Sequence, residues 1–171
     1  MREAVIVSTA RTPIGKAFRG AFNDTQAQEM AGHAIAEAVK RSKVSKEEID
    51  DVIIGAAGQQ GSQQGNIARQ SLLRAGLPVS VAGMSLDRQC ASGMMAIATA
   101  AKEITEDGMT ITVGGGVESV SLVRNENFRM DRARDPWLEE NIPSLYMTMI
   151  ETAENVAKRY GISREAQDEY S

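Results

Sequence analysis

Four short runs of β-branched and other apolar residues recur along the chain, and between them apolar residues return at helical spacing. The four runs lie at 4–7, 51–55, 81–86 and 110–115. Each run predicts a largely buried strand. Because strands and helices alternate, the pattern favours the α/β class, with a mainly parallel sheet and helices on its faces.

Two of the predicted helical segments begin with a capping-box pattern, in which a Ser or Thr is followed three residues later by Glu or Gln. Thr25 and Gln28 form the first pattern, ahead of an amphipathic helix, and Ser45 and Glu48 form the second, ahead of a short turn. Further helices are predicted at 66–76, at 90–107, at 152–160 and from Ser163 onward.

The helix predicted at 90–107 differs from the others because its first turns have almost no polar face. Within 90–101 only Ser92, Gly93 and Thr99 interrupt the small apolar residues. A helix that is apolar on all sides is typically buried. We therefore expect this helix at the centre of the fold.

The chemical character of the chain changes after Ser121. Residues 122–144 are highly charged, contain the only tryptophan and show no clean period. We interpret them as an extended excursion with a functional or interface role, because long loops in compact chains usually have one.

Composition excludes several classes of function. The formal net charge of −4 and an aromatic content of 4% provide neither a basic stripe nor a stacking surface, so nucleic acid is not an expected partner. No run approaches the roughly 20 apolar residues that a membrane helix needs. A single cysteine in 171 residues forms no internal disulfide. Together these features predict a soluble, cytoplasmic protein that does not bind membranes.

That single cysteine, Cys90, lies where the strand predicted at 81–86 passes into the next helix. In open α/β sheets such turns face the ligand crevice, and the dipole of a helix start favours a thiolate. The small residues Ser92 and Gly93 leave room for a substrate carbonyl near the backbone N–H of Cys90. A lone cysteine is also commonly a small buried apolar residue. The residues alone leave both interpretations open.

The segment SLDRQCASGMMAI, at 85–97, resembles the signature around the acyl-accepting cysteine of the thiolase family. Other segments are similar to thiolases in the same order along the full length of the chain. They are VIVSTARTPIGK at 5–16, GNIARQ at 65–70, GGGVESVS at 114–121 and TAENVAKRYGISREAQDEYS at 152–171.

The resemblance implies a fold and a reaction. The fold would be the N-terminal half of a layered α/β/α/β/α structure, with a core at 1–120 and the start of an inserted loop region at 121–171. Cys90 would be the nucleophile in cleavage of a 3-ketoacyl-CoA by coenzyme A, or in the reverse condensation of two acyl-CoA molecules. Coenzyme A would be a substrate, and no metal or redox cofactor would be required. Thiolases also form homodimers or homotetramers.

The resemblance also places several catalytic groups outside this chain. Thiolases use a histidine and a second cysteine from a C-terminal half, which is absent here, so we expect no turnover from the chain alone. The only histidine, His33, is expected on a helix surface. Asp87 stands where the signature usually has Asn, Ser or Thr, which places a carboxylate near a cysteine that must ionise.

Two further residues are candidates for substrate binding. Met149 is followed by Ile150 where the family often has glycine, which suggests a different pocket wall. Arg132, with Arg129 and Arg134, would meet the phosphates of coenzyme A, although such charges also commonly form a solvated loop face. Two alternatives to a thiolase stay open: a ketoacyl synthase of the same fold, and a non-catalytic module that binds lipid or a protein partner.

Overall fold

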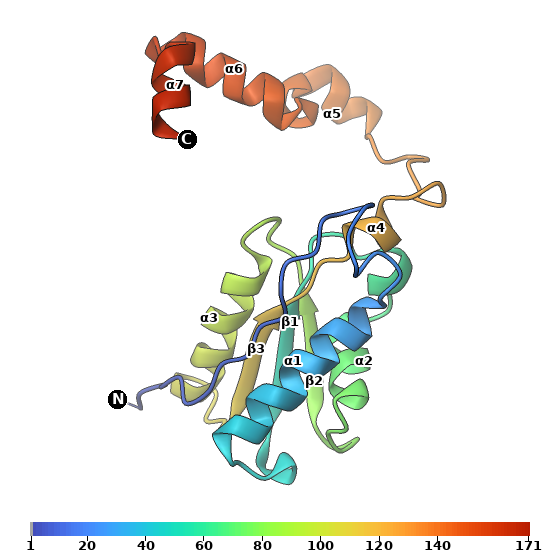
Figure 1. The fold of residues 1–171 in the computed structure, drawn as a ribbon, viewed down its shortest axis with the longest axis vertical. Coiled ribbons are helices and arrows are strands. Elements are labelled where there is room, and N and C mark those ends of the chain that lie inside the picture. The colour runs from blue at the N-terminus through green and yellow to red at the C-terminus, as the bar shows by residue number, and fades with distance from the viewer. Residues whose placement is uncertain (1) are drawn as a thin grey trace. The chain divides into compact units, whose positions relative to one another are not determined.

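The computed structural model describes residues 2–171, which form two compact units, one ending at Phe128 and one covering Arg129–Ser171. None of the helices in residues 2–171 has the length and apolar character needed to cross a membrane. The first unit contains, in chain order, α1 (Ala27–Ser42), a 3-10 turn (Lys46–Glu48), β1 (Asp51–Gly55), a second 3-10 turn (Gly61–Gln63), α2 (Ile67–Arg74), β2 (Ala82–Leu86), α3 (Ser92–Thr105), β3 (Thr112–Gly116) and α4 (Val120–Val123) (Figure 1).

The three strands of the described chain pair in parallel, in the order β2-β1-β3. Ile53 of β1 lies opposite Met84 of β2 and Gly114 of β3. Helices α1 and α2 lie on one side of the sheet and α3 on the other (Figure 1), so that β1 is buried along its whole length. The predicted α/β class, with a parallel sheet and helices on both faces, is confirmed.

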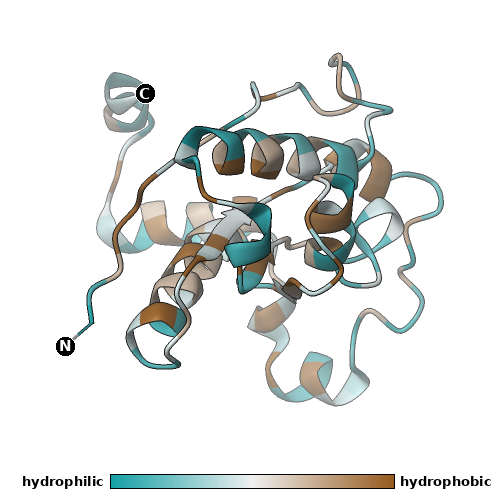
Figure 2. Cartoon of the chain, turned by 90° about the horizontal axis from the view of Figure 1, so that it is seen from below, coloured by the Kyte–Doolittle hydropathy of each residue, from teal (hydrophilic) through white to brown (hydrophobic). Residues whose placement is uncertain are grey.

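The two faces of the sheet support cores of different size. The side chains between the sheet and the α1, α2 pair form the larger core, which includes Ile35, Val52 and Leu72. On the α3 side the buried apolar residues are only Ile53, Ala96 and Ala100. Figure 2 shows apolar and polar colours alternating along the helices, as expected where one face of a helix is covered.

The segment at 4–7 does not form the predicted strand. It pairs with no strand in residues 2–171, and the chain beyond it is attached to α1 by a 2.7 Å hydrogen bond from Ser8 Oγ to the carbonyl of Ala38. A β-branched run fits a pleated surface but does not supply a pairing partner. The hydrophobic pattern therefore predicted a strand that does not form. The exposed side chains are Val5, Ile6 and Val7.

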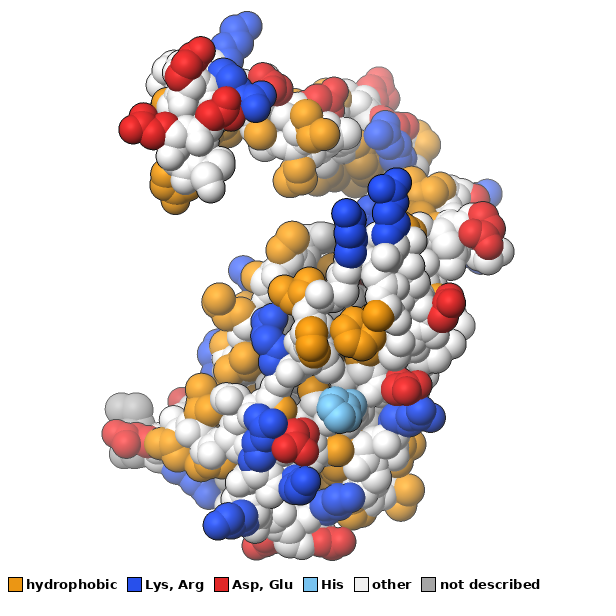
Figure 3. Space-filling model, viewed as in Figure 1, with side chains coloured by type: hydrophobic (Ala, Val, Ile, Leu, Met, Phe, Trp, Pro, Cys, Tyr) orange, Lys and Arg blue, Asp and Glu red, His pale blue; other side chains and the backbone are white. Residues whose placement is uncertain are grey.

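The burial predicted for the helix at 90–107 is wrong for one of its faces. The side of α3 toward the sheet is covered, but Met94 is 76% exposed and Ile97 is also exposed. Apolar side chains gather on this flank of the first unit in Figure 3. Within the first unit α3 has only one layer to pack on, so the apolar residues on its other side stay at the surface.

The two predicted capping boxes have different outcomes. The Ser45–Glu48 box forms as expected. The Thr25–Gln28 box does not, because α1 begins after Gln26 without a side-chain cap. Gln28 instead donates a 2.6 Å hydrogen bond from Nε2 to Oε1 of Gln70 on α2. A partner on a neighbouring helix has replaced the local cap.

The second unit is more helical than the sequence pattern predicts. It contains α5 (Pro136–Asn141), a 3-10 turn (Pro143–Tyr146), α6 (Met149–Tyr160) and α7 (Arg164–Tyr170). Part of the charged excursion at 122–144 is therefore helical, and Asp135 caps α5 by accepting from the N–H of Leu138 at 3.0 Å. Helix α6 begins three residues before the predicted start, after a capping box formed by Thr148 and Glu151.

Candidate active site around Cys90

Cys90 lies in the turn between β2 and α3, two residues before the helix begins, and it is exposed. The turn is held by hydrogen bonds from the N–H of Ala91 to the carbonyl of Arg88 and from the N–H of Ser92 to the carbonyl of Gln89, both 3.1 Å long. Gln89 has a left-handed backbone with a φ of 50°, which is uncommon for a residue other than glycine. The sequence prediction that Cys90 occupies a strand-to-helix turn is confirmed.

The carboxylate of Asp87 points into this turn. Its Oδ1 accepts the N–H of Gln89 at 2.7 Å and lies 3.4 Å from Oγ of Ser92. The Ser92 hydroxyl donates to the carbonyl of Gln89 at 2.6 Å and accepts the N–H of Arg88 at 2.8 Å. Asp87 is therefore an acceptor that helps to hold Gln89 in its left-handed conformation, immediately before the cysteine.

Two glycines, Gly55 and Gly116, allow the first turn of α3 to rest directly on the ends of two strands. A Cβ atom on Gly55, the last residue of β1, would clash with the backbone of Ser92. A Cβ on Gly116, the last residue of β3, would lie 2.9 Å from Cα of Gly93. Backbone meets backbone at this contact, which we call the glycine seam. The start of the helix therefore has no side chain between it and the sheet.

A hydrogen-bonded network connects the loops that leave β1 and β3. Oε2 of Glu118 accepts the N–H groups of Ala57 and Gly58, at 2.9 and 3.3 Å. Oε1 accepts Nε2 of Gln63 at 2.8 Å. Gln63 also donates to the carbonyl of Gly58 at 2.7 Å and accepts the N–H of Ser119. Sequence reasoning missed this network because its members are distant in the chain and no local motif links Gln63 to Glu118.

Two carboxyl groups are buried at the end of the sheet where the strands begin, away from Cys90. Asp51 begins β1, and burial raises its pKa. Glu103 lies near the end of α3, where burial raises its pKa and the charges of Asp51 and Asp107 raise it further. Oε2 of Glu103 has no hydrogen-bond partner among the described residues.

The other predicted residues lie elsewhere. His33 is on an exposed position of α1, and the single histidine is visible at the surface in Figure 3. Met149, which is 76% exposed, and Arg132 belong to the second unit, whereas Cys90 belongs to the first. A common site for Cys90, Met149 and Arg132 stays a prediction.

The three arginines of the basic cluster have different surroundings. Arg129 pairs with Asp131 at 2.7 Å. Arg134 pairs with Glu139 at 3.2 Å and lies over the ring of Tyr146. Arg132 has a left-handed backbone and no ion pair within the described part of the chain. Of the three, Arg132 is therefore the arginine whose guanidinium makes the fewest contacts with acidic or aromatic side chains in the described part of the chain.

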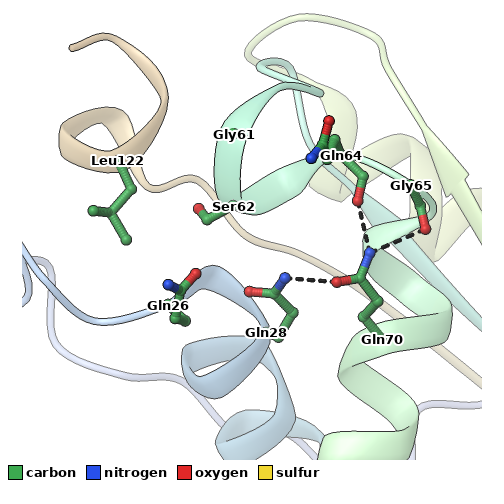
Figure 4. A pocket seen from close by; sticks show the side chains of 8 residues that line it. All are labelled: Gln26, Gln28, Gly61, Ser62, Gln64, Gly65, Gln70 and Leu122. Carbon is green, nitrogen blue, oxygen red and sulfur yellow. Dashed lines mark hydrogen bonds between the residues drawn. The ribbon is translucent and has the colours of Figure 1, made fainter. Parts of the chain in front are cut away.

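A cavity of about 590 Å³ lies between the start of α1, the turn before α2 and α4, and no residue of the Cys90 turn lines it. Figure 4 shows amide side chains around it, with Nε2 of Gln70 donating to the carbonyls of Gln64 and Gly65 at 2.6 and 3.0 Å. Oε1 of Gln28 and Oγ of Ser62 have no hydrogen-bond partner among the described residues. The lining residues are Gln26, Gln28, Gly61, Ser62, Gln64, Gly65, Gln70 and Leu122.

An accessible cysteine on a turn that follows a parallel strand and precedes a helix is typical of α/β enzymes that use a covalent nucleophile. The model of the thiolase N-terminal domain matches residues 4–171. The chain therefore belongs to the thiolase family.

Individual relatives agree with this assignment. The chain is 40% identical to the 3-ketoacyl-CoA thiolase of Bacillus subtilis, with all of this chain and 43% of that protein covered. It is 39% identical to the acetyl-CoA acetyltransferase of Cupriavidus necator, with all of this chain and 46% of that protein covered.

A solved structure is also similar. The crystal structure of the Bacillus anthracis acetyl-CoA acetyltransferase superposes with a TM-score of 0.81 at 37% identity, with 99% of this chain and 45% of that chain covered. The chain thus spans less than half the length of the relatives it matches.

Proposed function

We propose that the whole protein is an acyl-CoA acyltransferase that cleaves a 3-ketoacyl-CoA with coenzyme A or runs the reverse condensation. The observation that carries this proposal is the exposed Cys90 in the β2–α3 turn of a chain that belongs to the thiolase family. The names of the relatives, 3-ketoacyl-CoA thiolase and acetyl-CoA acetyltransferase, support the same class of reaction.

Cys90 is the proposed nucleophile. Its thiolate adds to the C3 carbonyl carbon of the 3-ketoacyl-CoA, and the C2–C3 bond then breaks. The electron pair of that bond leaves with the acetyl-CoA enolate, which takes up a proton. The acyl group stays on sulfur as a thioester and passes to the thiolate of coenzyme A, which regenerates Cys90. A thiol suits both halves of this exchange because the two thioesters are similar in energy.

The remaining roles are divided between this chain and the rest of a thiolase. The proton transfers are assigned to a histidine and a second cysteine of the C-terminal half, so the chain by itself is proposed to have no turnover. Residues 121–171 are proposed to begin the inserted loop region, where Arg132 contacts phosphate groups of coenzyme A and Met149 lines the acyl pocket. The first of these two contacts is supported because, within residues 2–171, Arg129 and Arg134 form ion pairs and Arg132 does not.

A homodimer or homotetramer is proposed for the whole protein, in the cytoplasm. The sheet order leaves β2, the strand that leads to Cys90, at an edge within the described chain. An edge strand carries backbone groups that are available for pairing with another chain, which supports an interface of this kind.

The proposed function is tested by trapping the acyl group. The whole protein is incubated with acetyl-CoA without an acceptor, and the peptide that contains Cys90 is examined by mass spectrometry. We expect an acetyl group on Cys90 and none on the Cys90→Ala variant. A non-catalytic module that binds lipid or a protein would leave Cys90 unmodified, and that result would overturn the proposal.

The same preparation separates a thiolase from a ketoacyl synthase. A thiolase accepts free coenzyme A as the nucleophile that removes the acyl group, so coenzyme A should discharge the acetylated protein. The chain of residues 1–171 alone should show no thiolysis of acetoacetyl-CoA. Turnover by that chain would overturn the assignment of the proton transfers to the C-terminal half.

A further inference from the structure

The network of Glu118 and Gln63 joins two loops that are far apart in the sequence. Glu118 accepts from the loop after β1, 60 and 61 residues earlier. Gln63 is 1% exposed, and both of its amide atoms are bonded. A buried amide with complete hydrogen bonding fixes its neighbours, because moving any of them leaves a buried polar group unpaired.

The loops joined by this network leave the strand ends that make up the glycine seam. Ala57 and Gly58 follow Gly55 by two and three residues, and Glu118 follows Gly116 by two. The N–H of Val117 also donates to the carbonyl of Gly55 at 3.0 Å. The network therefore holds the ends of β1 and β3 at a fixed separation.

A shift of the strand ends would move the Cys90 turn, because backbone packs directly on backbone at the glycine seam. Gly55 touches the backbone of Ser92, and Gly116 touches Gly93, in the first turn of α3. No flexible side chain lies at this contact to absorb a shift of the strands. Ser92 in turn accepts from Arg88 and donates to Gln89, the residue immediately before Cys90.

We propose that Glu118 and Gln63 are positioning residues for Cys90, which act by fixing the strand ends on which the first turn of α3 rests. This inference rests on the proposed function of Cys90. In each of its hydrogen bonds in the described chain Glu118 is an acceptor, so its role is to hold N–H groups. Displacements of about 1 Å at a reacting group cost on the order of 100-fold in rate, so a small change at the network has a large effect on the thiol.

The test measures single-turnover acetylation of Cys90 in the whole protein, at several acetyl-CoA concentrations, with the peptide that contains Cys90 quantified by mass spectrometry. We expect Glu118→Gln to lower the maximal rate constant about 10-fold, with little change in the half-saturating concentration. Glu126→Gln, which removes an exposed carboxylate eight residues further along the chain, is the matched control and should leave the rate constant unchanged.

An exchange of the two side chains sharpens the test. Gln63→Glu places two carboxylates together and should slow acetylation further. The double variant Gln63→Glu, Glu118→Gln restores one carboxylate and one amide, and we expect it to recover part of that loss. If Gln63→Glu does not fold, the rate constant of Glu118→Gln alone decides.

The readout distinguishes positioning from loss of folded protein, because irreversible unfolding lowers the amplitude of acetylation and leaves its rate constant unchanged, and urea unfolding of the same variant excludes a significant reversibly unfolded fraction. A normal rate constant in Glu118→Gln would overturn this inference. Failure of the proposed function has a different signature, namely no acetyl group on Cys90 of the wild-type protein, or acetyl transfer or turnover that survives in Cys90→Ala.

Discussion

At the carboxyl edge of the sheet, where the three parallel strands end, Gln63 is buried and both of its amide atoms are hydrogen-bonded. At the amino edge, where the strands begin, Glu103 is buried and one of its carboxylate oxygens has no partner among the described residues. The first arrangement stabilises a unique placement of the two loops that follow β1 and β3. The second costs stability, because a buried charge without a partner is disfavoured. The comparison shows that the buried polar side chain near Cys90 has its hydrogen bonds satisfied, whereas the buried carboxyl group at the other edge does not.

The largest expected effect is on the chemistry of the carboxyl edge. Cys90→Ser in the whole protein should reduce thiolysis of acetoacetyl-CoA by more than about 1,000-fold, because the hydroxyl is a far weaker nucleophile than the thiolate. Thermal unfolding should be nearly unchanged, since Cys90 is exposed. Glu103→Gln at the amino edge is the control and should retain turnover. Equal losses in the two variants would remove the functional distinction between the edges.

The next effect is on stability at the glycine seam. Gly55→Ala places a methyl group against the backbone of Ser92, and we expect it to lower the free energy of unfolding by about 3 kcal/mol. Gly115→Ala is the matched control because its added Cβ would lie 3.7 Å from Cδ1 of Ile54, an ordinary contact. Urea unfolding measures both. Similar losses for the two variants would show that the seam is looser than its geometry requires.

A smaller effect concerns the charge beside the thiol. Asp87→Asn keeps an oxygen that accepts the N–H of Gln89 and removes a negative charge, which opposes ionisation of a nearby thiol. Acetylation of Cys90 at neutral pH should become about 3-fold to 10-fold faster. An unchanged acetylation rate would mean that a partner such as Arg88 already neutralises Asp87. Asp87→Ala, which loses the acceptor as well, should not share the gain.

The smallest effect is at the amino edge. Because the pKa of Glu103 is raised above its ordinary value of 4.5, the folded chain binds this proton more tightly than the unfolded chain. Its contribution to stability is greatest below that ordinary value and is lost as pH rises through the raised pKa. Glu103→Gln should therefore increase the free energy of unfolding at pH 7 by about 1 kcal/mol and have little effect at pH 4.

Urea unfolding at the two pH values measures this difference, and Glu106→Gln, at an exposed position of the same region, is the control. A variant of Glu103 that is less stable than wild type at pH 7 would mean that the buried carboxylate has a stabilising partner, and the contrast between the edges would then be lost.

Local signals predicted much of the first unit. The strand at 51–55, the Ser45–Glu48 capping box and the turn that carries Cys90 all follow from residues close together in the sequence. The prediction of a strand at 4–7 was wrong because a strand needs a pairing partner, and a local sequence pattern does not reveal one. The predicted burial of the helix that contains Met94 was wrong for a similar reason, since burial depends on whether another layer of the structure packs against that side chain.

The candidate site divides in the same way. Cys90 and its turn have a sequence signature, but Gln63 and Glu118 are separated by 55 residues and meet only because β1 and β3 are neighbours in the sheet. Polar residues in a glycine-rich loop resemble solvated ones until the fold provides their partners. Arg132 and Met149 remain predictions because they belong to the other compact unit.

The glycine seam also constrains how the sequence can vary. Gly55 and Gly116 come from two separate strands, and a side chain on either would push against the backbone at the start of α3. In a comprehensive substitution library Gly55 and Gly116 should behave as one intolerant pair, although they are far apart in the chain, whereas a Cβ on Gly93 would lie at an ordinary 3.5 Å from Cα of Gly116. Meanwhile the outward face of α3, with Met94 and Ile97, faces no such limit within this unit. Evolutionary drift can therefore alter the exposed side of this helix while its attachment to the sheet stays fixed.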